Sequence, residues 1–308
     1  MHKIIFLCLI LFFSFLLPDS LYCQEPPKKK VLSIGRATND VISQQKRLEP
    51  IITYLSAKLK DIGIERGEVI LAGDNKVSSL IRLVKEGRVD IILESPLIAT
   101  LLKVEADAAP ILTVWREGVG EYNSLIFVRK DSGIQKIEDL KGKLIAFKDP
   151  GSNSGYFLPR IGLKANGLEL IELSSFNSIV PNNKAGFVFA GSELNISSWV
   201  FYKKAAAGAL SNLAWVSPKD VPESYKKEFK IIYESQKMPE FIVLIRKGLD
   251  RRFVERIKEE LLRMDRDKKG KEAIKLYGFN KFVEPNENSW DFMMIIENQI
   301  KLSGERFN

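Results

Sequence analysis

The sequence predicts an α/β fold in which buried parallel strands alternate with helices. Between residues 31 and 93, three short apolar runs alternate with two segments whose apolar residues recur at helical spacing, the pattern of a parallel sheet with helices on both faces. The 308 residues are 45% hydrophobic and 28% charged, which is ordinary for a globular protein and sufficient for two lobes of typical size. Ligands of such sheets bind at the carboxyl ends of the strands, so the loops after Gly35, Leu93 and Phe147 are the first places to expect a site.

Residues 1–23 have the features of a signal peptide and do not belong to the predicted fold. Lys3 gives a positive start, and residues 4–17 are apolar apart from Ser14. An apolar run of this length is too short to span a bilayer and has the length of a signal-peptide core. We therefore expect export, with a mature protein that is periplasmic or extracellular and starts with a Pro/Lys tether over residues 24–30.

Both cysteines, Cys8 and Cys23, lie in this leader, so a mature chain that begins at Gln24 can form no internal disulfide. Cys23 has two interpretations: it is the residue before the cleavage site, or it is the lipidated first residue of a membrane-anchored lipoprotein. Tyr22 is bulky where lipoprotein signals carry a small residue, which favours the soluble product. The lipoprotein alternative stays open.

Catalytic and metal chemistry has few candidate residues. The single histidine, His2, is lost with the leader, which removes Ser-His and Cys-His pairs and His/Cys metal sites from the mature chain. Phosphate-binding GxxxxGK[ST] loops and paired-glycine dinucleotide loops are absent. The net charge of +8 is spread along the chain without an aromatic and basic cluster, which argues against nucleic acid as a partner. We expect no enzyme activity, no catalytic or metal-binding residue and no cofactor.

Apolar periodicity places the elements along the chain. Residues 48–60, for example, carry Leu48, Ile51, Leu55 and Leu59 on one helical stripe. The predicted strands are residues 31–35, 69–71, 89–93, 111–115, 124–129 and 241–245, and the predicted helices are residues 48–60, 77–85, 249–264 and 289–302.

Residues 144–167 carry the strongest local pattern. An apolar strand leads into the turn Asp149-Pro150-Gly151, and Ser152-Asn153-Ser154-Gly155 then opens a segment of helical spacing that closes at Asn166-Gly167. Ser152 and Ser154 can each cap the helix, and the glycines let backbone N–H groups approach a guest. Free amides at a positive helix end suit a tetrahedral oxyanion, although a capped helix that binds nothing explains the pattern equally well. Pro159 falls beyond the first helical position, so we expect an irregular first turn.

Three blocks in this region resemble a known family. They read YNSLIFV at residues 122–128, IEDLKGK at residues 137–143 and DPGSNSGYFLP at residues 149–159. In this order and spacing they resemble the phosphate, phosphite and phosphonate substrate-binding proteins of ABC importers, the PhnD-like family. The resemblance runs from about residue 31 to about residue 283.

The resemblance implies a periplasmic-binding-protein type II fold, a clamshell of two α/β lobes joined by two crossing strands. Residues 31–129 would form the first part of lobe one, and residues 130–237 would form lobe two. Residues 238–308 would return to lobe one with a strand and the C-terminal helices.

The resemblance also implies ligand-binding residues. Ser152, Asn153, Ser154 and Gly155 match the serine-rich anion loop of the family, and Ser95 matches a position that lines the cleft from the other lobe. Tyr122, at the crossing, and Arg36, just past the first strand, are further candidates that could equally be surface residues. A guanidinium at position 36 would suit a phosphate or phosphonate because its fork fits such oxygens.

Two departures from the family pattern affect the identity of the ligand. Glu193 follows Gly191-Ser192 where many relatives have histidine, and an ionised carboxylate would repel a dianion. Glu193 must therefore point away, pair with a cation, or face a ligand that is not a simple phosphonate. Near Ala206 the family usually carries an acidic residue, and without it an aminoalkyl phosphonate loses the partner of its amine.

The expected function is capture of a small phosphate-like, phosphite-like or phosphonate-like oxyanion for delivery to an ABC permease, by a monomeric protein. The first alternative is the same clamshell acting as a sensor that presents its closed form to a membrane receptor or kinase, with a changed ligand. The second is an exported hydrolase that reuses the fold, against which the missing histidine counts.

Overall fold

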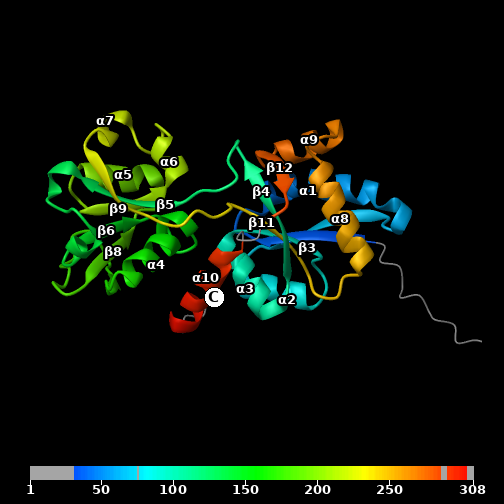
Figure 1. Cartoon of the computed structure of the whole chain (residues 1–308), viewed down its shortest axis with the longest axis horizontal. Coiled ribbons are helices and arrows are strands. Elements are labelled where there is room, and N and C mark those ends of the chain that lie inside the picture. Colours follow the sequence, from blue (N-terminus) through cyan, green and yellow to red (C-terminus); the bar gives the residue numbers. More distant parts are fainter. Residues whose placement is uncertain (1–30, 75, 286–289, 304–308) are drawn as a thin grey trace, which may run out of the picture.

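The computed structural model of the chain describes residues 31–74, 76–285 and 290–303. They form two six-stranded sheets, each of which carries helices, and Figure 1 shows them as two bodies side by side. The predicted signal peptide at residues 1–23, with Cys23, and the tether at residues 24–30 lie outside the described residues. None of the helices formed by the described part of the chain is long and apolar enough to cross a membrane.

The first sheet has the strand order β12-β4-β11-β3-β1-β2. Strand β1 is parallel to β2 and β3, whereas β11 is antiparallel to β3 and β4, and β12 is antiparallel to β4. The expectation of a parallel sheet is therefore correct only for the half that ends at the edge strand β2, because β4 leaves for the second sheet and β11 returns from it without a helical crossover. The strands are β1 (Val31–Ala37), β2 (Arg66–Ala72), β3 (Ile91–Glu94), β4 (Ala109–Arg116), β11 (Ile242–Ile245) and β12 (Phe279–Val283).

Six α-helices pack around this first sheet. Helix α1 begins earlier than the predicted 48–60, since Asp40 caps it by accepting a hydrogen bond from the Ser43 amide at 3.2 Å. Its first turns are exposed or half-buried and therefore show no apolar stripe. Helix α3, which starts at the Ser95-Pro96 step, was not predicted. The helices are α1 (Val41–Lys58), α2 (Val77–Lys85), α3 (Pro96–Ala106), α8 (Arg251–Arg263), α9 (Lys268–Lys275) and α10 (Asp291–Ser303), with a 3-10 turn η1 (Lys60–Ile62).

The second sheet has the order β10-β5-β9-β6-β8-β7, with β6, β7, β8 and β9 paired in parallel and β5 antiparallel to both its neighbours. The strands are β5 (Ser124–Arg129), β6 (Leu144–Phe147), β7 (Leu170–Glu172), β8 (Ala185–Phe189), β9 (Ala207–Ser211) and β10 (Phe229–Glu234). The helical segments are α4 (Leu158–Ala165), α5 (Glu193–Phe201), α6 (Asn212–Val216), α7 (Glu223–Lys226), the 3-10 turns η2 (Lys130–Ser132) and η3 (Ile137–Leu140), and the π-helical turn η4 (Asn153–Phe157).

Two extended segments connect the sheets, one between β4 and β5 and the other between β10 and β11. They pair with each other at Tyr122 and Met238, whose amides and carbonyls exchange hydrogen bonds of 2.8 and 2.9 Å. Strand β5, which the predicted boundaries assigned to the first part of lobe one, is itself a strand of the second sheet. The chain therefore passes between the two bodies twice, at one shared seam (Figure 1).

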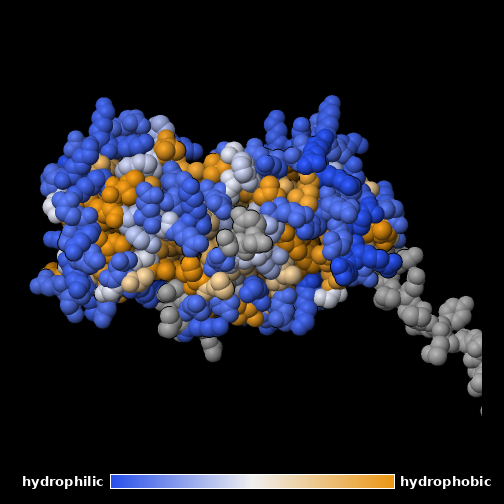
Figure 2. Space-filling model, in the orientation of Figure 1, coloured by the Kyte–Doolittle hydropathy of each residue, from blue (hydrophilic) through white to orange (hydrophobic). Residues whose placement is uncertain are grey.

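Apolar side chains fill both faces of each sheet, in four buried clusters. One of these clusters crosses from one body to the other. It joins Met293 and Ile296 of α10 with Phe157 and Leu158, which lie at the start of α4. Polar residues cover most of the face seen in Figure 2, where apolar residues show in patches on both bodies and across the waist between them.

Candidate functional site

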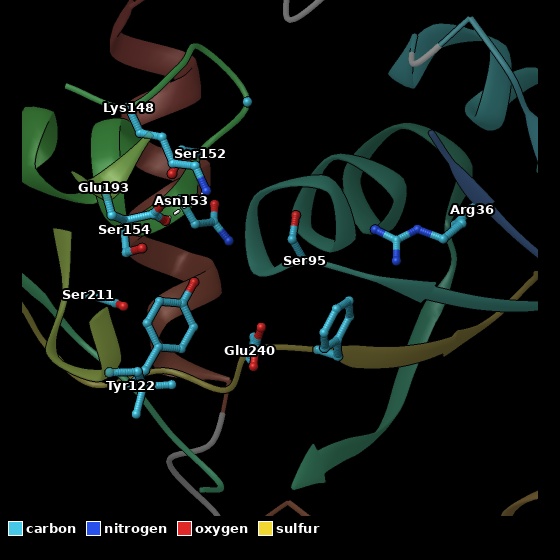
Figure 3. Close-up of a pocket in the computed structure, with 13 residues that line it drawn as sticks. Arg36, Ser95, Tyr122, Lys148, Ser152, Asn153, Ser154, Glu193, Ser211 and Glu240 are labelled. Carbon is cyan, nitrogen blue, oxygen red and sulfur yellow. Dashed lines mark hydrogen bonds and ion pairs between the residues drawn. The ribbon is translucent and has the colours of Figure 1, made fainter. Parts of the chain in front are cut away.

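A pocket of about 250 Å³ lies between the two sheets. Its walls come from both bodies and from the segments that connect them (Figure 3). The lining residues are Arg36, Ser95 and Phe241 on the first body, Lys148, Gly151, Ser152, Asn153, Ser154, Glu193, Ser211 and Leu213 on the second, and Tyr122 and Glu240 on the connecting segments. Every predicted site residue except Gly155 is among them.

The loop after β6 forms one wall of the pocket and enters an irregular helix. Ser152 caps it, since its Oγ accepts a hydrogen bond from the Gly155 amide at 3.1 Å and its carbonyl accepts one from the Phe157 amide at 2.9 Å. Residues Asn153–Phe157 form a π-helical turn, and the α-helix begins only at Leu158, with Pro159 in its first turn. The expected irregular first turn is therefore confirmed.

The amides of this loop are not equally available. The Ser152 amide donates to the Asp149 carbonyl at 3.1 Å, and the Gly155 amide is used by the Ser152 cap. The expectation that the amides of the serine-rich loop are free for a ligand is therefore wrong for Ser152, and the Gly155 amide is occupied as well. Within the described residues, the amides of Asn153 and Ser154 have no hydrogen-bond acceptor, so these two are the open donors at the helix start.

The side chain of Asn153 also lacks a partner with hydrogen-bond geometry, although the Tyr122 hydroxyl lies near it. Both its Oδ1 and its Nδ2 are buried without a hydrogen bond to any described residue, and in Figure 3 the amide points into the pocket. Buried polar atoms are nearly always hydrogen-bonded in folded proteins. A guest that both accepts and donates hydrogen bonds would satisfy this amide.

Neighbouring residues hold the loop in place. The buried hydroxyl of Ser124 donates to the Ser154 carbonyl at 2.6 Å. The peptide groups of Lys148 join two loops, because its amide donates to the Gly155 carbonyl at 2.9 Å and its carbonyl accepts from the Gly191 amide at 2.8 Å. The open amides therefore have a fixed direction before any guest arrives.

Glu193 pairs with a cation, the second of the three alternatives open for it. Its Oε1 lies 2.7 Å from Nζ of Lys148, and both side chains are about two-thirds buried. Glu193 is the first residue of α5, where the helix dipole favours a carboxylate. The carboxylate and the ammonium together bring no net charge to the wall of the pocket.

Arg36 is held by the protein itself on the opposite side of the pocket (Figure 3). Its guanidinium donates to the Tyr277 hydroxyl and to Gln44 Oε1, and it lies 3.7 Å from the buried Glu94 carboxylate. Burial raises the pKa of Glu94, while Arg36 and the amides of Ala37 and Ser95 offset part of this rise. Arg36 is therefore a neutralised cation and not a free anchor.

Ser95 and Tyr122 contribute hydroxyl groups. Ser95 is the N-cap of α3, but its side chain makes no cap bond, so its hydroxyl faces the pocket without a partner among the described residues. Tyr122 is buried, and burial raises the pKa of its phenol well above the ordinary value, an effect that the nearby Asn153 amide opposes in part. Tyr122 thus stays a neutral donor at any physiological pH.

Comparison with known proteins agrees with this geometry. Residues 37–290 match the family of periplasmic substrate-binding proteins of phosphonate ABC transporters. The chain belongs to this family. Its members are transporter binding proteins of the periplasm and not enzymes.

Solved structures resemble this phosphonate-type binding protein over most of its length. XAC2383 from Xanthomonas citri, bound to chloride ion, is 29% identical, with a TM-score of 0.79 over 89% of this chain and 98% of that one. PhnD1 from Prochlorococcus marinus, in complex with methylphosphonate, is 18% identical, with a TM-score of 0.60 over 88% and 98%. The sulfonate-binding protein SsuA from Methylobacillus flagellatus is 14% identical, with a TM-score of 0.56 over 90% and 88%. The predicted type II fold is confirmed.

Sequence reasoning missed several lining residues of this binding protein. Lys148 directly follows the β6 strand and could have been suspected from that position at a strand end. Ser211 ends β9 and Leu213 follows it, and this strand was not predicted. Glu240 and Phe241 precede β11, whose start was predicted one residue too early. Glu240 brings a carboxylate that pairs with Arg116, and no local pattern marked it. Among the described residues, no cluster of His, Cys, Asp or Glu could hold a metal ion.

Gly155 is buried and does not line the pocket. We expect Gly155→Ala to destabilise this binding protein. A Cβ there would lie 2.6 Å from Lys148 Cβ and 2.9 Å from Ser152 Oγ, an overpacking that typically costs about 1–3 kcal/mol. Chemical denaturation measures this loss. Gly151→Ala is the matched control, because its Cβ would meet only Asp149 Oδ1, at 3.4 Å. Equal stability of the two variants would contradict the packing described here.

Proposed function

We propose that the protein captures a small tetrahedral oxyanion of the phosphate, phosphite or phosphonate type and delivers it to an ABC permease. The observation that carries the proposal is a set of unsatisfied donors at one wall of the pocket: the amides of Asn153 and Ser154 and the buried side chain of Asn153. Backbone amides at a helix start are suited to anions. The pocket volume of about 250 Å³ falls below the roughly 300–1,000 Å³ of drug-sized ligand sites, which favours a small guest.

Helix starts face the pocket from both bodies. Ser95 precedes α3 on the first body, and Ser152 and Glu193 stand at the starts of η4 and α5 on the second. Each end contributes a partial positive charge. A guest between them is therefore stabilised by dipoles from two directions, which supports closure of the two bodies over it.

The comparisons support the ligand class without fixing the compound. The similar structures have methylphosphonate or chloride bound, and one is named for sulfonate. Another structure of XAC2383, 28% identical with a TM-score of 0.78, is bound to ATP. All of these ligands except chloride carry tetrahedral oxyanion groups. We extend the proposal to a monomer that is exported by means of residues 1–23.

A thermal-shift screen tests the proposal. Phosphate, phosphite, methylphosphonate, sulfate and methanesulfonate are each added to the protein without its leader. A ligand at a hundred times its Kd stabilises the folded state by about 2.7 kcal/mol, and Tm rises by roughly 2–4 °C per kcal/mol in proteins somewhat smaller than this one. We therefore expect at least one phosphorus oxyanion to raise Tm by several degrees. No shift with any of them would overturn the proposed ligand class.

A further inference from the structure

All the charged side chains that line the pocket are paired. Lys148 pairs with Glu193 at 2.7 Å, Arg36 with the buried Glu94 at 3.7 Å, and Glu240 with Arg116. Among the described residues, no lining cation is left without a carboxylate. The pocket therefore offers hydrogen-bond donors and helix ends to an anion, but little net positive charge.

The pair between Lys148 and Glu193 is the one closest to the open amides. It shares the pocket wall with Ser152, Asn153 and Ser154 (Figure 3). The two loops that carry it are already joined through the Lys148 carbonyl and the Gly191 amide at 2.8 Å. The side-chain pair is thus not required to hold these loops together, and its effect falls on the charge of the site.

The charge of the guest affects both the free energy of its desolvation and the free energy of its attraction to the pocket, but it affects them differently. The cost of removing an ion from water grows with the square of its charge, whereas its attraction to fixed dipoles grows only in proportion to the charge. In a pocket without an unpaired cation, a dianion is therefore at a greater disadvantage relative to a monoanion than in a pocket that has one. Glu193 neutralises the cation that lies nearest to the amides.

We propose that the pair between Glu193 and Lys148 makes this pocket selective for singly charged tetrahedral oxyanions over doubly charged ones. This inference rests on the proposed function. The charged and titratable groups around the guest are Lys148 beyond β6, Glu193 on α5, Arg36 on β1 with Glu94 on β3, and Glu240 with Tyr122 on the connecting segments. Glu193 is then the residue that determines which ionisation state is bound.

Two ligands of the same shape separate charge from geometry. Methanesulfonate is a monoanion throughout the accessible pH range, whereas methylphosphonate changes from a monoanion to a dianion. Isothermal titration at about pH 5 and about pH 9 brackets that second ionisation, since phosphoryl groups lose their second proton near neutral pH. We expect constant affinity for methanesulfonate and an affinity for methylphosphonate that falls at least about tenfold at the higher pH.

Glu193→Gln assigns the selectivity to its residue. With Lys148 unpaired, we expect the dianion of methylphosphonate to bind at least about tenfold more tightly than in the native protein, with a smaller gain for methanesulfonate. Glu172→Gln, at the exposed last residue of β7, is the matched control and should change neither affinity. Circular dichroism at both pH values verifies the fold.

The outcomes are distinguishable. Tighter binding of the dianion by the native protein, or an unchanged preference in Glu193→Gln, would overturn the charge selectivity and leave the proposed function intact. Binding of neither ligand at either pH would overturn the selectivity, and the thermal-shift screen with phosphate and phosphite would then decide separately whether the proposed ligand class stands.

Discussion

Asn153→Leu is expected to weaken ligand binding roughly ten- to a hundredfold while leaving the unliganded protein at least as stable as the native one. Both polar atoms of the native amide are buried without a hydrogen bond to a described residue, a state that costs about 1–3 kcal/mol per group. Leucine has a similar size and no polar atom to desolvate. Each lost hydrogen bond to a charged guest is worth about 1.5–3 kcal/mol, or roughly ten- to a hundredfold in Kd.

Titration calorimetry and chemical denaturation measure the two sides of this prediction. Asn153→Asp should also weaken binding, because its charge repels the guest, but it should lower stability by burying a carboxylate. Asn166→Leu is the matched control, since Asn166 is an exposed residue at the end of α4 whose side chain donates to the Gly162 carbonyl at 2.8 Å. Native affinity in Asn153→Leu would show that this amide does not contact the ligand.

Asp90→Ala is expected to give the largest loss of stability, about 3–5 kcal/mol. The fully buried carboxylate accepts hydrogen bonds from the amide and the hydroxyl of Ser33, both at 2.9 Å, and from Nε of Arg246 at 2.8 Å. Ser33 lies on β1, and Arg246 directly follows the returning strand β11. Removing the carboxylate leaves a largely buried guanidinium and a serine amide without their partner.

Equilibrium unfolding in urea measures this loss. The control is Asp61→Ala, because Asp61 also pairs with an arginine, Arg256, at 2.7 Å, but on the exposed surface. Surface pairs contribute little because water and salt screen them, so we expect a negligible change there. Similar unfolding midpoints for the two variants would show that burial does not decide the strength of these pairs.

The sequence pattern predicted the local part of the site well. The strand Leu144–Phe147, the turn after it, the irregular helix start and the end near Asn166 all follow from residue types that are neighbours in the chain. Pro159 was decisive, because proline is tolerated in the first turn of an α-helix but not further inside it, so a regular α-helix could not begin as early as Ser152. Local steric rules act within a few residues, so they can be read from a single sequence.

The pairing of the charged side chains at the site could not be predicted, because the partners of each pair are distant in the chain. Arg36 donates to Tyr277, and Glu240 pairs with Arg116, contacts that exist only after the return strand joins the first sheet. Without them, Arg36 looked like a free guanidinium for a phosphate. The role of the Ser152 amide was also missed, since the sequence shows where a cap can form but not which amide the preceding turn consumes.

Because Asn153–Phe157 form a π-helical turn, the number of residues in this turn determines where the ligand-binding amides point. A π-helical turn spaces its hydrogen bonds one residue further apart than an α-helical turn. Deleting a single residue within this turn would rotate the open amides of Asn153 and Ser154 by about 100° around the helix axis relative to α4, the angle between successive α-helical residues. These donors would then turn away from the pocket even if every remaining side chain were unchanged, so the length of the turn determines binding independently of its composition.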